Sequence, residues 1–161
     1  MALNTFIKIG DIKGESQDNK HKDEIDVLSW SWGLEQSGAG HPGPSGGGGA
    51  GKVSVRDLSI TKRTDIATPQ LMLSCSNGQH IKEALLTVRK QDKNPLEFVR
   101  VKMSDVMVNS VSPSDSGAGF ITENVALSFS KVELDCVQQK PDGTTGPAYS
   151  FKWDIKANKP F

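Results

Sequence analysis

The sequence IDVLSWSWGL at residues 25–34 alternates large apolar side chains with small polar ones. Alternation with a period of two is typical of a β-strand that buries one face. The residues expected on the buried face are Leu28, Trp30, Trp32 and Leu34. The residues expected on the opposite face are Ser29, Ser31 and Gly33. This strand therefore indicates a β-sheet with an aromatic core on one side and a small, polar surface on the other.

The sequence YSFKWDI at residues 149–155 repeats the pattern near the end of the chain. The apolar positions there are Tyr149, Phe151, Trp153 and Ile155. All three tryptophans of the chain thus occupy expected inward positions. Because large aromatic side chains stabilise a protein most when buried, we predict that Trp30, Trp32 and Trp153 are core residues.

Three other apolar stretches change phase part-way along, stepping by three residues instead of two. The steps lie between Val55 and Leu58, between Met103 and Val106, and between Phe129 and Val132. One extra residue at each step, a β-bulge, would return the following side chains to the inward face. Because repeated bulges let long strands bend, the sequence predicts a mainly β fold, a bulged antiparallel β-barrel.

One short α-helix is expected among the strands, over about residues 69–76. Thr68 can cap this helix, Pro69 suits its first turn, and Asn77-Gly78 supplies a left-handed end. The residues expected to form its inner stripe are Leu71, Met72 and Cys75.

Length and charge exclude several classes of protein. A chain of 161 residues without internal repeats predicts a single domain over residues 1–161. Nineteen Lys and Arg balance nineteen Asp and Glu, which argues against a dedicated nucleic-acid binder. We expect neither membrane insertion nor a Sec-type signal, because the sequence has no long apolar run and no cationic start followed by an apolar stretch.

The cysteines and histidines do not suggest a metal site. Cys75 and Cys136 are too few for a disulfide framework and suit a reducing compartment. The histidines, His21, His41 and His80, share no ligand spacing with either cysteine. We therefore expect no metal and no other cofactor.

The glycine-rich sequence SGAGHPGPSGGGGAG at residues 37–51 holds eight of the sixteen glycines. It matches the dinucleotide pattern G-x-G-x-x-G and, around Ser45, the hydrolase pattern G-x-S-x-G. Both patterns act at the start of a helix, which Pro42 and four consecutive glycines prevent. A triad of Ser45 with His41 or His80 could be drawn, but no pattern brings these residues together, and we expect no enzyme. The length of the loop instead suggests a contact with another molecule.

Several short motifs follow one another along the chain. The longest are FIKI at residues 6–9, IKGES at 12–16 and IDVLSWSWG at 25–33. Further motifs are Gly51-Lys52-Val53, Thr61-Lys62, Asp65, Thr68-Pro69, Leu71 and Thr122-Glu123-Asn124-Val125. Together they resemble the hemolysin-coregulated protein (Hcp) family, the tube subunits of bacterial type VI secretion systems. The resemblance covers essentially the whole chain in the family's order.

The resemblance implies a β-barrel with a short helix that assembles into a homohexameric ring. Stacked rings would form a hollow tube inside a contractile sheath, tipped by a valine-glycine repeat (VgrG) spike. Small effector proteins would be carried in the lumen. The subunit would be made in the bacterial cytoplasm and secreted through this system without a signal peptide.

Two sets of contact residues follow from the resemblance. By position, residues 37–51 would form an extended loop that reaches neighbouring subunits. The candidates there are Ser37, Gly38, His41, Pro42, Ser45, Gly48 and Ala50. If the polar face of the strand at 25–34 lines the ring, Ser29, Ser31 and Gly33 contact effectors in the lumen.

Other interpretations remain open at this stage. Ser31 could instead be an ordinary solvent-facing residue on the outer wall of a ring. The whole chain could also be a generic ligand-binding or oligonucleotide-binding β-barrel. An oligonucleotide binder would need exposed aromatic residues among Lys and Arg, whereas most aromatic residues here alternate inward.

Overall fold

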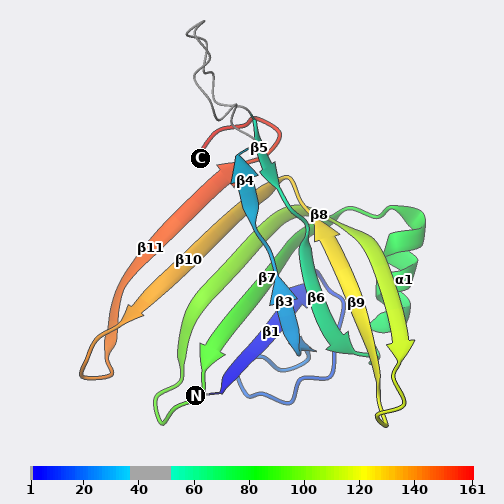
Figure 1. Ribbon diagram of the computed structural model, residues 1–161, viewed down its shortest axis with the longest axis horizontal. Helices are drawn as coiled ribbons and strands as arrows, with labels where there is room; N and C mark the ends of the chain where they lie inside the picture. Colours follow the sequence, from blue (N-terminus) through cyan, green and yellow to red (C-terminus); the bar gives the residue numbers. More distant parts are fainter. Residues whose placement is uncertain (1, 37–51) are drawn as a thin grey trace, which may run out of the picture.

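The computed structural model describes residues 2–36 and 52–161 (Figure 1). The strands are β1 (Leu3–Ile9), β2 (Ile25–Val27), β3 (Ser29–Ser31), β4 (Leu34–Gln36), β5 (Val53–Val55), β6 (Leu58–Arg63), β7 (Ile81–Lys90), β8 (Leu96–Asp115), β9 (Ile121–Ser128), β10 (Lys131–Gln139) and β11 (Thr145–Asp154). The helix is α1 (Thr68–Asn77). The predicted mainly antiparallel β fold with one short helix is confirmed. Within the described residues, no helix is long and apolar enough to cross a membrane.

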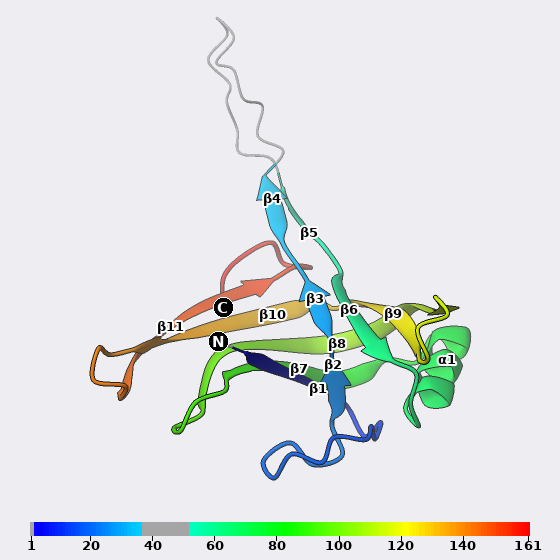
Figure 2. The ribbon, with the colours of Figure 1, turned by 60° about the horizontal axis from the view of Figure 1, so that its bottom comes forward.

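Nine of the strands form one antiparallel sheet that curls around the core (Figures 1 and 2). Its main path runs β2-β1-β7-β8-β9-β6-β3. Strand β10 also pairs with β8, and β11 pairs with β10. The remaining strands, β4 and β5, pair with each other as a separate two-stranded arm.

The sheet has the curvature of a barrel, but its hydrogen bonds do not close it. Strand β2 pairs with β1 at one end of the path, and β3 pairs with β6 at the other end. One residue, Leu28, joins β2 to β3, and its backbone N–H donates to the Thr61 carbonyl at 2.8 Å. The two ends of the sheet are therefore joined by the chain itself.

The change of strand partner at Leu28 explains an error in the predicted alternation. In β2 the inward residues are Ile25 and Val27, which are odd-numbered, whereas Trp30 and Trp32 face inward after it. Leu28 lies at the phase change and is 53% exposed, so its predicted burial is wrong.

Leu34 is also wrongly predicted as buried. It begins the arm formed by β4 and β5, where the chain leaves the curled sheet, and it is 46% exposed. The three tryptophans are half-buried and pack against the rim of the core. Their large side chains lie where the covering layers end, so each keeps part of its surface exposed.

The phase step between Met103 and Val106 lies inside the long strand β8. Asp105 there has φ of 54°, in the left-handed region, and both flanking apolar residues remain buried. The strand that faces it is interrupted at the same level, between the end of β9 and the start of β10. The pairing register is nevertheless the same on both sides of this interruption, with Met107 opposite Ser128 and Ser104 opposite Lys131. Both strands of this ladder thus change face together at one corner.

The other two predicted bulges correspond to strand ends. Residues 56–57 separate β5 from β6, and residues 129–130 separate β9 from β10. The register shifts within the described ladders occur elsewhere, between Val88 and Arg89, between Val108 and Ser110 and between Val137 and Gln139. The three predicted bulges are therefore wrong at these positions, because each step of three marks a corner or a strand end.

Helix α1 extends one residue beyond the predicted range at each end and packs on β8. It ends at Gly78, whose φ is 66° and whose N–H donates to the Ser74 carbonyl. Thr68 is not the cap, because it is already helical and its hydroxyl donates to Glu123 at 2.7 Å. Leu71 is buried, but Met72 is 38% exposed, so the predicted inner stripe is wrong at Met72.

Candidate assembly surfaces

Strands β10 and β11 extend beyond the curled part of the sheet, and we call them the wing (Figure 1). Cross-strand partners show that the core-facing surface continues onto the wing. One row contains Ile7, Leu86, Val101, Leu134 and Phe151. The first three are fully buried, whereas Leu134 and Phe151, on the wing, are only half-buried. The apolar face of the sheet thus continues onto the wing, where less of the protein covers it.

The next row along the wing is less covered still. It contains Val88, Val99, Cys136 and Tyr149. Val88 is buried, Cys136 is exposed and Tyr149 is 64% exposed. Tyr149 was expected to face inward, and it does lie on the core-facing side, but no other layer reaches it. An apolar sheet face of this kind is a site for another protein surface.

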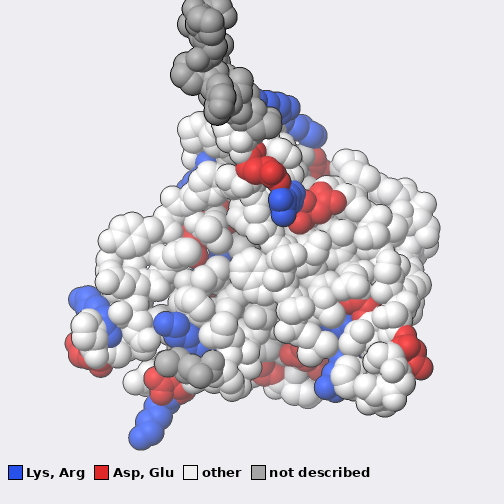
Figure 3. All heavy atoms as spheres, viewed as in Figure 1, with Lys and Arg blue, Asp and Glu red and all other residues white. Residues whose placement is uncertain are grey.

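The wing also ends in an edge strand. Among the described strands, β11 pairs only with β10. Figure 3 shows that the middle of this side of the molecule carries few charged side chains. The wing therefore offers both apolar side chains and backbone hydrogen-bonding groups to a partner.

The predicted lumen residues lie on β3 and just after it. Ser29 and Ser31 are exposed, on the side opposite to the half-buried Trp30 and Trp32. Gly33 is half-buried, and a Cβ built on it would meet no atom within 4 Å. The structure thus leaves these positions accessible.

Small uncharged residues extend this exposed face across the neighbouring strands. Ser31 lies opposite Ser59, which lies opposite Ala126, which lies opposite Ser110. The next row contains Ser29, Thr61, Asn124 and Ser112, with the Thr61 hydroxyl donating to Asn124 Oδ1 at 2.8 Å. We call these two rows the small-residue strip. The sequence pattern showed only its β3 members, because the other members are brought beside them by strand pairing.

The arm of β4 and β5 carries an exposed ion pair. Arg56 Nη2 lies 2.5 Å from Glu35 Oε1. The residues between the two strands, 37–51, lie outside the described residues. The loop candidates all fall in that range: Ser37, Gly38, His41, Pro42, Ser45, Gly48 and Ala50.

Residues 11–24, which we call the strap, cross the outer face of the sheet. His21 is buried and stacks on Phe6, with ring centroids 4.5 Å apart. Its Nδ1 lies 2.7 Å from Glu24 Oε2 and its Nε2 lies 2.7 Å from Glu97 Oε1. Each ring nitrogen thus faces a carboxylate, one from the strap and one from β8. No sequence spacing connected His21 with Glu97.

A second contact attaches the strap to β7. The Arg89 guanidinium binds both oxygens of Asp18. The hydrogen bond from Arg89 is the main reason that the pKa of Asp18 falls from 3.8 to about 2. The Arg89–Asp18 ion pair, the hydrogen bond between His21 and Glu97 and the stack of His21 on Phe6 therefore hold the strap in place.

A fully buried ion pair joins β6, β9 and α1. Lys62 Nζ donates to Glu123 and, at 2.8 Å, to Asp65 Oδ1. Thr68 and Thr64 add hydroxyl donors to Glu123 at 2.7 Å and 3.3 Å. The sequence motifs contained these residues, but no motif showed that the pair would be buried.

Of the serine and histidines named for a triad in the sequence, only His80 lies within the described residues. His80 Nδ1 binds Asp105 Oδ1 at 2.7 Å, while Ser130 donates to Asp105 Oδ2 at 2.6 Å. The Ser130 and His80 hydrogen bonds, with Lys156, lower the pKa of Asp105 well below its usual range. Ser45 and His41 lie outside the described residues. In the parts of the chain that the structure describes, no three His, Cys, Asp or Glu side chains lie together in a way that could hold a metal ion.

The described residues thus form a curled antiparallel sheet with an uncovered apolar wing, and a surface of that kind is typical of proteins that bind other proteins. Comparison with known proteins agrees with this class. The sequence model of the family described as "Type VI secretion system effector, Hcp" matches residues 6–135. The chain therefore belongs to the Hcp family of type VI secretion system proteins. This is a structural family of the secretion apparatus, not a known family of enzymes.

Individual relatives cover nearly the entire chain. It is 50% identical to Protein hcp1 of Pseudomonas aeruginosa, in an alignment that covers 98% of this chain and 98% of that protein. The crystal structure of Hcp1 from Salmonella typhimurium is 41% identical, covers 100% of both chains and superposes with a TM-score of 0.83. A type VI secretion system effector from Yersinia pestis is 33% identical, with a TM-score of 0.75 over 94% of this chain and 99% of that one.

Proposed function

We propose that this chain is the tube subunit of a type VI secretion system. Six copies form a ring, and rings stack into a hollow tube within a contractile sheath and below a valine-glycine repeat spike. Effector proteins travel in the lumen, and the subunit leaves the bacterium through the same system. Membership of the Hcp family and the relatives' type VI secretion names support this proposal.

The uncovered wing is the observation that supports assembly. A single chain leaves Tyr149 and Phe151 in contact with water on a sheet face that elsewhere forms the core. Covering this face with another copy would remove apolar surface from water, the main favourable term in protein association. A contact between two different faces of the subunit repeats around a ring when the rotation closes.

The small-residue strip supports the placement of Ser29, Ser31 and Gly33 in the lumen. A wall of short uncharged side chains offers neither bulky side chains nor fixed charges to a passing protein. Its serines and Asn124 are exposed in a single copy, while Thr61 and Ala126 are half-buried, so the strip does not have to rearrange to line the hole.

Residues 37–51 are proposed as the extended contact between subunits. Replacing them with a tight two-residue turn should leave a folded subunit, because β4 and β5 pair only with each other among the described strands. Ring assembly or stacking should weaken. A shortened chain that assembles and is secreted normally would rule out this role.

Electron microscopy and light scattering of the purified protein test the proposal directly. We expect rings with a central hole and a mass about six times that of the chain. Tyr149→Glu should lower the fraction of rings, whereas Leu28→Glu, at a similarly exposed leucine, should not. Compact monomers of 17.4 kDa at all concentrations would contradict the tube function.

A further inference from the structure

The outward face of α1 is unusually apolar for an exposed helix. The helix sequence TPQLMLSCSN contains no charged residue. Its outward side carries Leu73, which is 54% exposed, and Met72, which is 38% exposed. Ile66, just before the helix, is 63% exposed. We call these three residues the helix patch.

Such a surface requires an explanation beyond the fold of one chain. A surface helix ordinarily carries charged and polar residues on its outward side. Here the inward side, with Leu71 and Ser74, already packs on the sheet. The helix patch is therefore a second apolar side that the single chain leaves in water.

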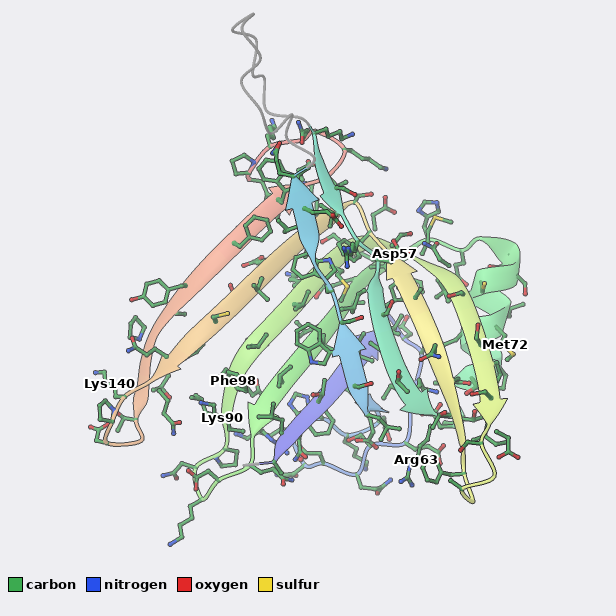
Figure 4. All side chains as sticks on the ribbon, in the orientation of Figure 1. Asp57, Arg63, Met72, Lys90, Phe98 and Lys140 are labelled. Atoms are coloured by element: carbon green, nitrogen blue, oxygen red, sulfur yellow. The ribbon has the colours of Figure 1, made fainter. Side chains whose placement is uncertain are left out.

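The helix patch and the wing lie on opposite flanks of the molecule in both ribbon views (Figures 1 and 2). In Figure 4, Met72 lies on the helix flank and Lys140, at the tip of the wing, lies on the other. A ring of identical copies needs two different surfaces that face neighbours on either side. The two exposed apolar surfaces have this arrangement.

We propose that the helix patch of each subunit packs on the inner face of the wing of the next subunit. This inference rests on the ring proposed above and names the two surfaces that meet in it. The occupant of the wing is thus a second copy of this chain, presented through α1.

The two surfaces match in chemistry. The exposed or half-buried residues of the wing's inner face are Leu134, Cys136, Tyr149, Phe151 and Trp153. No member of either surface is charged, so the contact would bury no unpaired ion. A helix packed on a sheet face is also the arrangement that α1 already adopts on β8 within the chain.

The main competing arrangement pairs two wings face to face. Such a contact is symmetric and closes after two copies. It would leave the helix patch of both copies in water and could not extend into a ring. The helix-to-wing contact covers both surfaces in every copy.

Chemical cross-linking tests the contact in the full chain. The starting variant carries Cys75→Ser and Cys136→Ser, and a short bismaleimide then bridges introduced cysteines. With Leu73→Cys and Tyr149→Cys together, we expect a ladder of covalent oligomers up to the size of the ring. With Leu28→Cys and Tyr149→Cys, a matched pair at exposed positions, we expect no ladder.

The outcomes separate this inference from the tube function. Rings in the microscope without a ladder would overturn the helix-to-wing contact and leave the ring intact. Efficient dimers from Tyr149→Cys alone would overturn it in favour of paired wings. The absence of rings from the unmodified protein would instead contradict the proposed function.

A charge exchange gives an independent readout. Leu73→Lys and Tyr149→Glu should each lower the apparent association constant at least tenfold, because each places a charge opposite an apolar surface. The two together should recover most of the loss, because the charges then face each other. Losses that simply add in the double variant would contradict the contact.

Discussion

Arg89 in β7 binds Asp18 in the strap through its two terminal guanidinium nitrogens, with Nη1 donating to Oδ1 at 3.0 Å. The two residues are far apart in sequence, and the pair fastens a long irregular segment to the outer face of the sheet. Bidentate pairs of this kind fix orientation as well as adding energy. The stability of the strap should therefore depend on the charge of Asp18.

Asp18→Asn should lower the free energy of unfolding at pH 7 by about 1 kcal/mol. Because the folded pKa of about 2 lies below the ordinary 3.8, the contribution is present above about pH 4 and is lost as the pH falls through 2. Urea unfolding of both proteins across this range checks the expectation. Asp11→Asn, at an exposed position, is the control, and an equal loss at every pH would argue against the ion pair.

Lys62 and Glu123 form a buried ion pair, and replacing Lys62 alone should lower the free energy of unfolding more than replacing both residues. Lys62→Met should lower the free energy of unfolding by about 3–5 kcal/mol, because Glu123 would remain buried without its counter-charge. Adding Glu123→Leu should recover a large part of this loss. Denaturant unfolding of the single and double variants measures the difference, and a double variant less stable than Lys62→Met would contradict the explanation.

Trp30→Ala should lower the free energy of unfolding by about 2–3 kcal/mol, less than for a fully buried tryptophan, because part of the ring is exposed. The control is Leu28→Ala, two residues earlier, where the side chain is 53% exposed and the loss should be under about 0.5 kcal/mol. Equal effects in thermal unfolding would show that the two residues are not on differently covered faces.

Ser31→Gln should leave stability and ring formation unchanged, because the side chain is exposed and its strand neighbours are small. It should reduce the amount of effector that co-purifies with the rings, because one substitution is repeated in every copy around the hole. Ser116→Gln, on the turn between β8 and β9, is the matched control. Unaltered co-purification and export of every effector would place Ser31 outside the lumen contact.

The sequence predicted the type of fold because alternation reports directly on which face of a strand is covered. It succeeded at Trp30 and Trp32, which do face the core, and at the helix end, where Gly78 adopts the left-handed conformation. The alternation predicted the wrong face at the point where the chain changes its neighbouring strand. Leu28 follows the same parity as Trp30, but it lies between two strands that pair with different neighbours.

Alternation also cannot show where a covering layer stops. Tyr149 and Phe151 lie on the same face of β11, yet their exposure differs because the rest of the sheet covers one end of the wing better. Met72 was misassigned for a related reason, since an apolar residue on a helix suggests the core even when it lies on the outside. The surfaces proposed for assembly therefore include apolar residues whose burial the sequence misjudged.

The small-residue strip and the strap contacts could not be predicted, because both depend on strand register. Ser31 and Ser59 become neighbours only when β3 pairs with β6. His21 meets Glu97 only after the strap crosses the outer face of the sheet.

The edge strand β11 also determines how the chain avoids uncontrolled aggregation. A flat apolar edge would invite indefinite strand addition into fibrils. Pro147 near the start of β11 has no N–H to offer an incoming strand, and Lys152 pairs with Glu133 at 3.6 Å on the outer side of the wing. We expect these two residues to hinder the addition of further strands at the free edge of β11 in a subunit that has not yet assembled.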